Sequence, residues 1–347
     1  MSEPTFGQLN PAASHYWNGP AWGWQRLWIC PDGIQEAVRA CYGVSADSAS
    51  FLAAGMLNQS WHITSTDGEF VLRVARSDRS WDQIKYEHAL TTELHKHIDV
   101  VIPPEAGLDR KSLQNWQGRP VPLFRYVDGI AGTELAAEAR LASVASVLGR
   151  IHRRTLELDW PQRPGFRSVH DEPRWVWKKF EPVLRRRLGA AEVGSSFEII
   201  DAAVANLDDW LDAASRTGGL GPEAVVHGDF NNRNVLFHKH APTSRLCGVI
   251  DWDDCCVNPL AWELAQLAFR TGEYDVEQFW SVYIESGGPV ETKDIKLLSN
   301  FALMGELSEL EWTVDDGETG PRAAEQVREL AAAVVAIQQR TQEILSM

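Results

Sequence analysis

Residues 225–237 read VVHGDFNNRNVLF, a short polar stretch enclosed by two apolar runs. Asp and Asn favour turns, so one interpretation is a plain polar loop between two strands. The other is a loop that carries chemistry, because Asp229 follows the end of an expected strand and Asn234 lies shortly after it. Asp251 follows a second apolar run, RLCGVI, and would close a hairpin that brings it near Asn234.

These three polar side chains suit phosphoryl transfer. Carboxylate and amide oxygens are ligands of Mg²⁺, which takes few protein ligands and leaves positions for phosphate oxygens. The transition state is loose, so catalysis consists mainly of positioning and charge neutralisation. We therefore expect Asn234 and Asp251 to bind Mg²⁺, while Asp229 orients a substrate hydroxyl and accepts its proton. Asn231 and Asn232 are expected to form the turn.

Around this loop, the sequence predicts a sheet-rich first part and a helical second part. The Asp67-Gly68 pair is a strong signal for a hairpin turn, and Ser80 is suited to cap a helix. Strands are expected at 48–63, 69–76, 99–108, 119–127, 235–240 and 245–251, and helices at 31–44, 80–97, 132–156, 175–188, 195–215 and from 259 onward. We expect an α+β fold with a Trp-rich extension (1–30), an N-terminal lobe (31–127) and a helical C-terminal lobe (128–347).

The composition limits the class of partner and the compartment. A net charge of −15 over 347 residues argues against a nucleic-acid partner. It permits a cationic small substrate, although a solvated acidic surface is the simpler explanation. Five cysteines without a CxxC pair predict neither a disulfide framework nor a zinc site. The start, MSEPTFGQLN, lacks a signal-peptide pattern and no apolar run is long enough to span a bilayer, so we expect a cytoplasmic protein without a membrane partner.

HGDFNNRNVLF followed by GVIDWD resembles the catalytic loop and metal-binding segment of the aminoglycoside phosphotransferase and choline kinase-like family of small-molecule kinases. The resemblance covers most of the chain, from about residue 33. It implies a bilobal, protein-kinase-like fold that binds ATP or GTP between its lobes and uses Mg²⁺. It also implies that Asp229 is the catalytic residue, that Asn234 and Asp251 hold the metal, and that His227 is a scaffold for the loop.

Further segments resemble the nucleotide site of this family. FVLRV resembles the strand that supplies a phosphate-binding lysine, here Arg73, and Glu87 is placed like the helix glutamate that pairs with that cation. PLFRYVDG, which contains Phe124 and Tyr126, resembles the hinge whose backbone groups bind the base. Two residues depart from the family pattern. The guanidinium of Arg73 would hold the phosphates or Glu87 in a bidentate manner, and Glu263 stands where the family often has Asp, which we expect to support the loop.

The acceptor is less determined than the reaction. The resemblance implies that a helical insertion and the C-terminal helices hold the substrate. The candidate substrate-binding residues are Asp253, Trp175, Trp177, Trp312, Asp315 and Asp316. Acidic groups beside an aromatic ring suit an amine-bearing antibiotic or amino sugar, but an acidic surface loop explains them equally well. The function expected first is an antibiotic-inactivating kinase, which the breadth of the family favours. The alternatives are a metabolic kinase for a sugar, amino sugar or choline-like amino alcohol, and a non-catalytic nucleotide-binding module, which the filled catalytic-loop positions disfavour.

Overall fold

The computed structural model separates the chain into two compact units. The first comprises the chain up to Ile130 together with Leu236–Lys239 and Cys247–Asp253, and the second comprises the remaining segments. The residues that the structure describes are 31–52, 58–75, 80–166, 172–239, 245–291, 294, 297–314 and 321–346. The predicted Trp-rich extension lies outside them.

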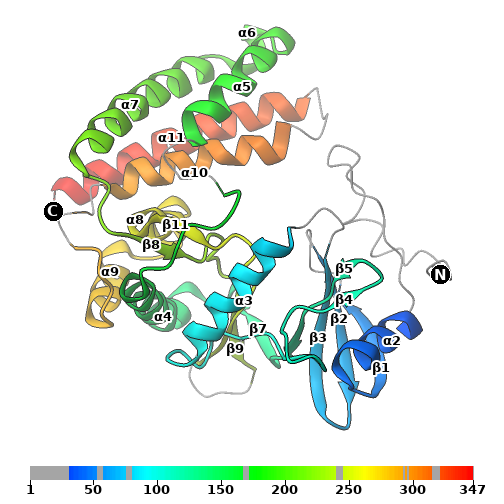
Figure 1. The fold of residues 1–347 in the computed structure, drawn as a ribbon. Coiled ribbons are helices and arrows are strands. Elements are labelled where there is room, and N and C mark those ends of the chain that lie inside the picture. Colours follow the sequence, from blue (N-terminus) through cyan, green and yellow to red (C-terminus); the bar gives the residue numbers. More distant parts are fainter. Residues whose placement is uncertain are drawn as a thin grey trace. The chain divides into compact units, whose positions relative to one another are not determined.

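A four-stranded antiparallel sheet forms the first unit (Figure 1). Its strands, in sheet order, are β1 (Ala46–Leu52), β2 (Asn58–Ser65), β3 (Gly68–Ala75) and β6 (Leu123–Arg125). The predicted hairpin at Asp67-Gly68 is confirmed, because Ser65 pairs with Gly68 across the turn. Gly68 has a φ of 121°, a conformation that only glycine adopts readily.

The two faces of this sheet differ in chemistry. Along β3, Phe70, Leu72 and Val74 are buried in a core that includes helix α2 (Pro31–Tyr42). Side chains alternate along a strand, so Arg73 projects from the opposite face. Helix α3 (Trp81–His95) begins where predicted, with the Ser80 side chain accepting from Gln83 N at 3.5 Å. The alternation along β3 therefore places the Arg73 side chain on the face opposite the apolar core.

The remaining strands of the first half are short. They are β4 (Asn115–Trp116), β5 (Arg119–Pro120) and β7 (Gly129–Ala131), and β7 joins β9 (Val235–His238) and β10 (Leu246–Val249) in the order β10-β9-β7. The strand predicted at 99–108 is wrong, because only isolated bridges occur there, at Val101 and Pro104. The reason is the Pro103-Pro104 pair, which offers no N–H donor to a ladder.

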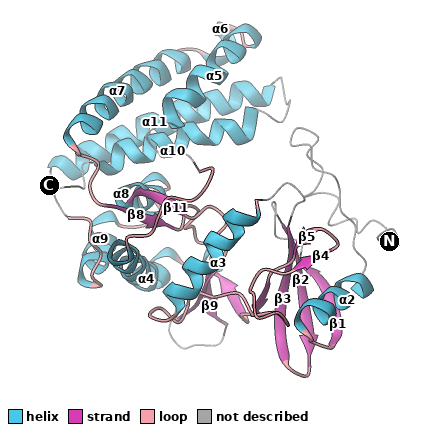
Figure 2. Cartoon of the chain, viewed as in Figure 1, coloured by secondary structure: helices cyan, strands magenta, loops and turns pink. Residues whose placement is uncertain are grey.

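Helices dominate the described residues of the second unit (Figure 2). In chain order the elements are a 3₁₀ turn (Gly132–Glu134), α4 (Ala137–Leu158), α5 (Glu172–Arg187), α6 (Ala190–Val193), α7 (Ser196–Thr217), β8 (Glu223–Val226), β11 (Cys256–Pro259), α8 (Leu260–Leu264), a π-helical segment (Ala265–Arg270), α9 (Val276–Glu285), α10 (Leu297–Val314) and α11 (Pro321–Ser346). Helix α10 packs against both α5 and α11, and α11 packs against α7.

A two-stranded ribbon of β8 and β11 positions the motif with which the sequence analysis began. The strands are antiparallel, with Val226 opposite Cys256. Both α4 and α8 pack against β8, and its valines, Val225 and Val226, are fully buried. Burying a valine stabilises a fold by roughly 1.5–3 kcal/mol. The polar loop therefore starts from a strand that is firmly held.

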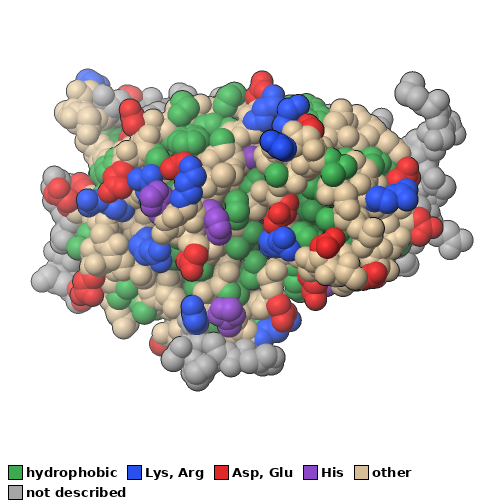
Figure 3. Space-filling model, turned by 60° about the horizontal axis from the view of Figure 1, so that its bottom comes forward, with side chains coloured by type: hydrophobic (Ala, Val, Ile, Leu, Met, Phe, Trp, Pro, Cys, Tyr) green, Lys and Arg blue, Asp and Glu red, His purple; other side chains and the backbone are tan. Residues whose placement is uncertain are grey.

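Basic and acidic side chains are interspersed over the face of the molecule shown in Figure 3. Among the described residues, every helix is too short or too polar to cross a membrane.

Candidate active site

The loop between β8 and β9 holds Asp229 between two amide side chains. Asn231 Nδ2 donates to Asp229 Oδ1 at 2.7 Å, and Asn234 Nδ2 donates to Asp229 Oδ2 at 2.9 Å. Asn234 Nδ2 also lies 2.9 Å from the backbone oxygen of Asp229. Hydrogen bonds to an ionised carboxylate are stronger than those between neutral groups. The carboxylate is thus oriented by its own loop, on a residue that is exposed.

Glu263 of α8 fixes the backbone of this loop by accepting hydrogen bonds from two of its N–H groups. Its Oε1 accepts from Gly228 N at 2.8 Å, and its Oε2 accepts from His227 N at 3.2 Å. Oε2 also lies 2.9 Å from His152 Nε2, and the other ring nitrogen of His152 lies 2.9 Å from the Tyr283 hydroxyl. The prediction that Glu263 supports the loop is confirmed by these contacts. His227 acts as a scaffold as predicted, because its Nδ1 accepts from Asp229 N at 3.3 Å.

The electrostatics of Glu263 favour its charged form. Burial alone raises the pKa of this carboxyl, but the hydrogen bond and charge of His152, the charge of His227 and the Gly228 N–H outweigh burial and lower the pKa below its ordinary value. An ionised carboxylate can accept from every one of these donors. The buried glutamate is therefore satisfied, although it is only 1% exposed.

Asn232 has a role that sequence reasoning missed. Its Nδ2 donates to Glu273 Oε2 at 2.5 Å, and its Oδ1 accepts from the Tyr274 hydroxyl at 2.5 Å. Arg140 of α4 donates to both partners, to Tyr274 at 2.9 Å and to Glu273 at 3.0 Å. One indication of this network was present in the sequence: Arg140 is a charged residue at a position of α4 where the helical spacing predicts a buried side chain. Asn232 thus anchors the loop to α4 and to the segment after α8, in addition to forming a turn.

Gly228 is required by a close backbone approach. It has a φ of 87°, and a Cβ at this position would lie 2.1 Å from the backbone oxygen of Asp254. No other residue type fits such a contact without moving the backbone. The glycine between His227 and Asp229 therefore follows from the packing of the loop against the segment before β11.

Arg73 lies among carboxylates in the first unit. Its Nη2 is 2.8 Å from both Asp251 Oδ1 and Asp253 Oδ2, and its Nη1 is 3.7 Å from Glu87 Oε1. Burial by itself lowers the pKa of Arg73, but the charges of Asp253, Asp251 and Glu87 outweigh it and raise the pKa. Asn58 Nδ2 donates to the same Asp253 oxygen at 2.6 Å. The pairing of Arg73 with Glu87 is present as the resemblance implies, but Asp251 and Asp253 are closer.

The donor set fits a magnesium ion. The Nδ2 atom of Asn234 is engaged by Asp229, which leaves Oδ1 as the atom that can ligate. Asp251 follows β10 with a φ of 66°, and its side chain is 44% exposed. Within the described ranges, no three His, Cys, Asp or Glu side chains gather as they would around a metal ion. The amide oxygen of Asn234 and the carboxylate of Asp251 are each hard oxygen donors of the kind that Mg²⁺ takes.

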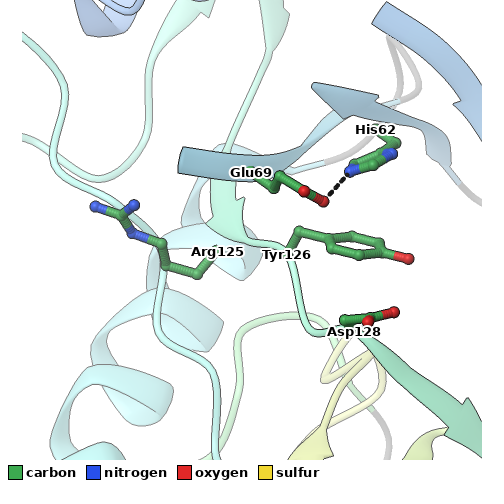
Figure 4. Close-up of a pocket in the computed structure, with 5 residues that line it drawn as sticks. All are labelled: His62, Glu69, Arg125, Tyr126 and Asp128. Atoms are coloured by element: carbon green, nitrogen blue, oxygen red, sulfur yellow. Dashed lines mark hydrogen bonds and ion pairs between the residues drawn. The ribbon is translucent and has the colours of Figure 1, made fainter. Parts of the chain in front are cut away.

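Phe124 and Tyr126, predicted to contact the nucleotide, lie at the end of β6. The Phe124 ring centroid is 5.9 Å from Arg73 Cζ, and the ring is in edge contact with His88. The Tyr126 ring stacks on His62 at a centroid distance of 4.1 Å. Figure 4 shows this pair in an open pocket, with Asp128 beside the phenol ring. Tyr126 therefore offers an aromatic surface directly at the predicted hinge.

The predicted substrate-binding residues are placed unevenly. Trp177 is buried, and its Nε1 donates to Asp201 Oδ1 at 2.8 Å, so it packs α5 against α7 and has almost no surface for a substrate. Asp253 is also buried, and its carboxylate accepts hydrogen bonds from Arg73 and Asn58, so little of its surface is left for a substrate. Trp175 and Trp312 lie on α5 and α10, with side chains outside the described set, and Asp315 and Asp316 fall outside the described residues.

Comparisons with known sequences identify one family. The sequence model of the phosphotransferase enzyme family matches residues 48–293. A homoserine kinase from Bradyrhizobium diazoefficiens is 27% identical over 222 residues, which cover 62% of this chain and 60% of that protein. A viomycin phosphotransferase from Streptomyces vinaceus is 28% identical over 106 residues, covering 30% of this chain and 34% of that protein. The chain therefore spans less than two thirds of the length of these curated relatives.

Solved structures with the same fold cover most of the chain. A spectinomycin phosphotransferase in complex with ADP and spectinomycin matches with a TM-score of 0.64 and 15% identity, covering 90% of this chain and 99% of that chain. A microcompartment-associated aminopropanol kinase matches with a TM-score of 0.62 and 20% identity, covering 89% and 97%. At these identities the likeness shows the fold, a kinase-like α+β architecture with a sheet-rich N-terminal region and a helical C-terminal region.

Proposed function

Because the chain belongs to the phosphotransferase enzyme family, we propose that it is a kinase that transfers the γ-phosphate of ATP to a hydroxyl group of a small molecule. One observation carries this proposal: Asp229 is oriented by Asn231 and Asn234 on a loop whose backbone is fixed by Glu263. The loop thus carries an oriented carboxylate and, five residues on, an amide whose oxygen can serve as a ligand. Phosphoryl transfer requires one group that orients the attacking hydroxyl and other groups that bind the metal ion and the phosphates.

The hydroxyl oxygen of the acceptor attacks the γ-phosphorus of ATP, and Asp229 accepts the proton that this hydroxyl loses. The new O–P bond forms while the bond between the γ-phosphorus and the β–γ bridging oxygen breaks, and ADP leaves with the bonding electron pair. Mg²⁺, held by Asn234 and Asp251, would neutralise charge on the phosphates. Arg73 orients phosphate oxygens through its guanidinium, and Phe124 and Tyr126 contact the base. GTP is the alternative phosphate donor.

The acceptor proposed first is a small alcohol that carries an amine. Homoserine kinases are among the curated relatives, and an aminopropanol kinase shares the fold. A net charge of −15 favours the approach of a cation. An antibiotic is the second candidate, because a viomycin phosphotransferase is also a relative and a spectinomycin phosphotransferase shares the fold. The amine-bearing alcohol is the feature that these acceptors have in common.

A phosphoryl-transfer panel tests the proposal. The purified protein would be incubated with ATP or GTP, Mg²⁺ and homoserine, aminopropanol, choline, amino sugars, viomycin, spectinomycin or a macrolide, and phosphorylated products would be detected by mass spectrometry. Asp229→Asn should reduce kcat by about 10³-fold or more, since general-base and positioning effects are both removed. Asp209→Asn, an exposed carboxylate on α7, should leave kcat unchanged. Full activity of the Asp229 variant would refute the assigned role, and nucleotide binding without any transfer would favour a non-catalytic module.

A further inference from the structure

Three carboxylates surround Arg73, but they hold it unequally. Asp251 and Asp253 each lie 2.8 Å from the Nη2 atom, within hydrogen-bond distance. The contact from Nη1 to Glu87 is 3.7 Å, which is an ion pair but too long for a hydrogen bond. Asp251 and Asp253, which follow β10, are therefore closer partners of the Arg73 guanidinium than Glu87 on helix α3.

Asp251 and Asp253 differ in their surroundings. The side chain of Asp251 is 44% exposed, whereas that of Asp253 is 6% exposed. Asp253 Oδ2 accepts from Arg73 at 2.8 Å and from Asn58 Nδ2 at 2.6 Å, and Asn58 is itself buried at the start of β2. A buried carboxylate with two donors on one oxygen is fixed in position. Asp251 is the accessible carboxylate of the two, and Asp253 is the anchored one.

The proposed metal role of Asp251 competes with its contact to Arg73. Both interactions use the negative charge of one carboxylate, and a divalent cation next to a guanidinium is repelled by it. The contact with Asp253 involves no residue assigned to the metal. The guanidinium has five N–H donors in a fixed fork, so Arg73 can keep a hydrogen bond to Asp253 while other N–H groups face phosphate oxygens. A lysine ammonium at this position would lack the fork that reaches both.

We propose that Asp253, fixed by Asn58, is the positioning residue that holds Arg73 in place for the phosphates while Asp251 serves the metal. This inference rests on the proposed kinase function. It explains why an arginine stands where the family has a lysine: the cation is anchored from the segment after β10 through a hydrogen bond, in addition to the looser pairing with Glu87. Asp253 acts through Arg73 and is not itself in contact with the reacting atoms.

Steady-state kinetics and ADP binding test this role with Asp253→Asn. The variant should raise KM for ATP and weaken Mg·ADP binding by about 10- to 100-fold, because one member of a buried charged pair is lost, while KM for the acceptor stays the same. Asp82→Asn is the control. It breaks another cation–carboxylate pair of the same unit, with Lys85 at 2.9 Å, on the exposed surface, and it should match the wild type.

A double-mutant cycle with Arg73→Ala separates positioning from general stability. If Asp253 acts through Arg73, adding Asp253→Asn to Arg73→Ala should raise KM for ATP by less than about 3-fold further. Additive effects, or an Asp253 variant with wild-type KM for ATP, would overturn the inference. If Asp253→Asn does not fold by circular dichroism, Asn58→Ala replaces it in the cycle. That variant keeps the carboxylate but removes its second donor, and it should raise KM for ATP by about 3- to 10-fold. A wild-type protein that neither binds nucleotide nor transfers phosphate would refute the proposed function instead.

Discussion

Replacing Glu263 by glutamine should loosen the loop that carries Asp229. The three donors that face this carboxylate, Gly228 N, His227 N and His152 Nε2, lie between 2.8 and 3.2 Å from its oxygens. Glutamine has the same shape but one of its two terminal groups is an NH₂ donor. Whichever way the amide turns, at least one N–H of the loop or of His152 then faces another donor.

The magnitude follows from the burial of the site. A hydrogen bond to a charged acceptor contributes about 1.5–3 kcal/mol, and a buried donor left unpaired costs about 1–3 kcal/mol. Because Glu263 is 1% exposed, water cannot replace the lost acceptor. We expect local opening of the loop to become easier by about 2–4 kcal/mol. At 1.4 kcal/mol for each factor of ten, this is an increase of about 30-fold to several hundred-fold in the open population.

Amide hydrogen exchange read by mass spectrometry measures that population. Peptides covering residues 224–234 should exchange faster in Glu263→Gln by the factor above, since exchange of hydrogen-bonded amides requires local opening. Phosphoryl transfer should fall in parallel, because the position of Asp229 depends on the same backbone. Glu277→Gln, an exposed glutamate on α9, is the control and should change neither quantity. Wild-type exchange rates at the His227 and Gly228 amides in Glu263→Gln would show that this carboxylate does not hold the loop.

Two further predictions concern other parts of the chain. Gly228→Ala should destabilise the protein by about 2–5 kcal/mol, because alanine disfavours the left-handed φ and its Cβ would clash with the Asp254 oxygen. Gly118→Ala is the control: Gly118 has a φ of 83° and open space around it, so only the cost of the left-handed φ should remain. Equal losses of unfolding free energy for the two variants in chemical denaturation would contradict the close approach at Gly228. Burial and then the charge of Arg73 lower the pKa of His88 to about 3, so the unfolded chain takes up a proton near pH 6.5 and the folded chain does not. Stability should therefore fall between pH 6.5 and 3, by about 2 kcal/mol at pH 5, and a His88→Gln variant that shows the same pH dependence would refute this.

Local signals were sufficient for the elements and for the centre of the site. The Asp67-Gly68 turn, the Ser80 cap and the long helices all follow from patterns within a few residues, and the structure contains them. The loop that carries Asp229 could be singled out because Asp229 and Asn234 lie on one short segment, whereas the hydrogen bond from Asn231 to Asp229 was not predicted. The failed strand at 99–108 shows the limit of apolar content as a signal, since two consecutive prolines lack the N–H donors of a continuous ladder and leave only isolated bridges.

Hydrogen-bond partners that are far apart in the sequence could not be predicted, because local patterns do not connect them. Asn58 reaches Asp253 across 195 positions, and Arg140 reaches Glu273 across 133. No periodicity connects residues that are so far apart, because their contact exists only after the elements pack. A buried charged residue on an otherwise apolar face, such as Arg140, indicates that a partner is needed but does not say which one.

The strands β9 and β10 make the first unit discontinuous in sequence. Leu236–Lys239 and Cys247–Asp253 belong to it, although residues 131–235 intervene. During synthesis, residues 131–235 therefore emerge between the N-terminal sheet and the last segments of its unit, which include both aspartates next to Arg73. An exchange of this unit with a relative, or its expression as a fragment, would have to carry residues 236–239 and 247–253 along with residues up to 130.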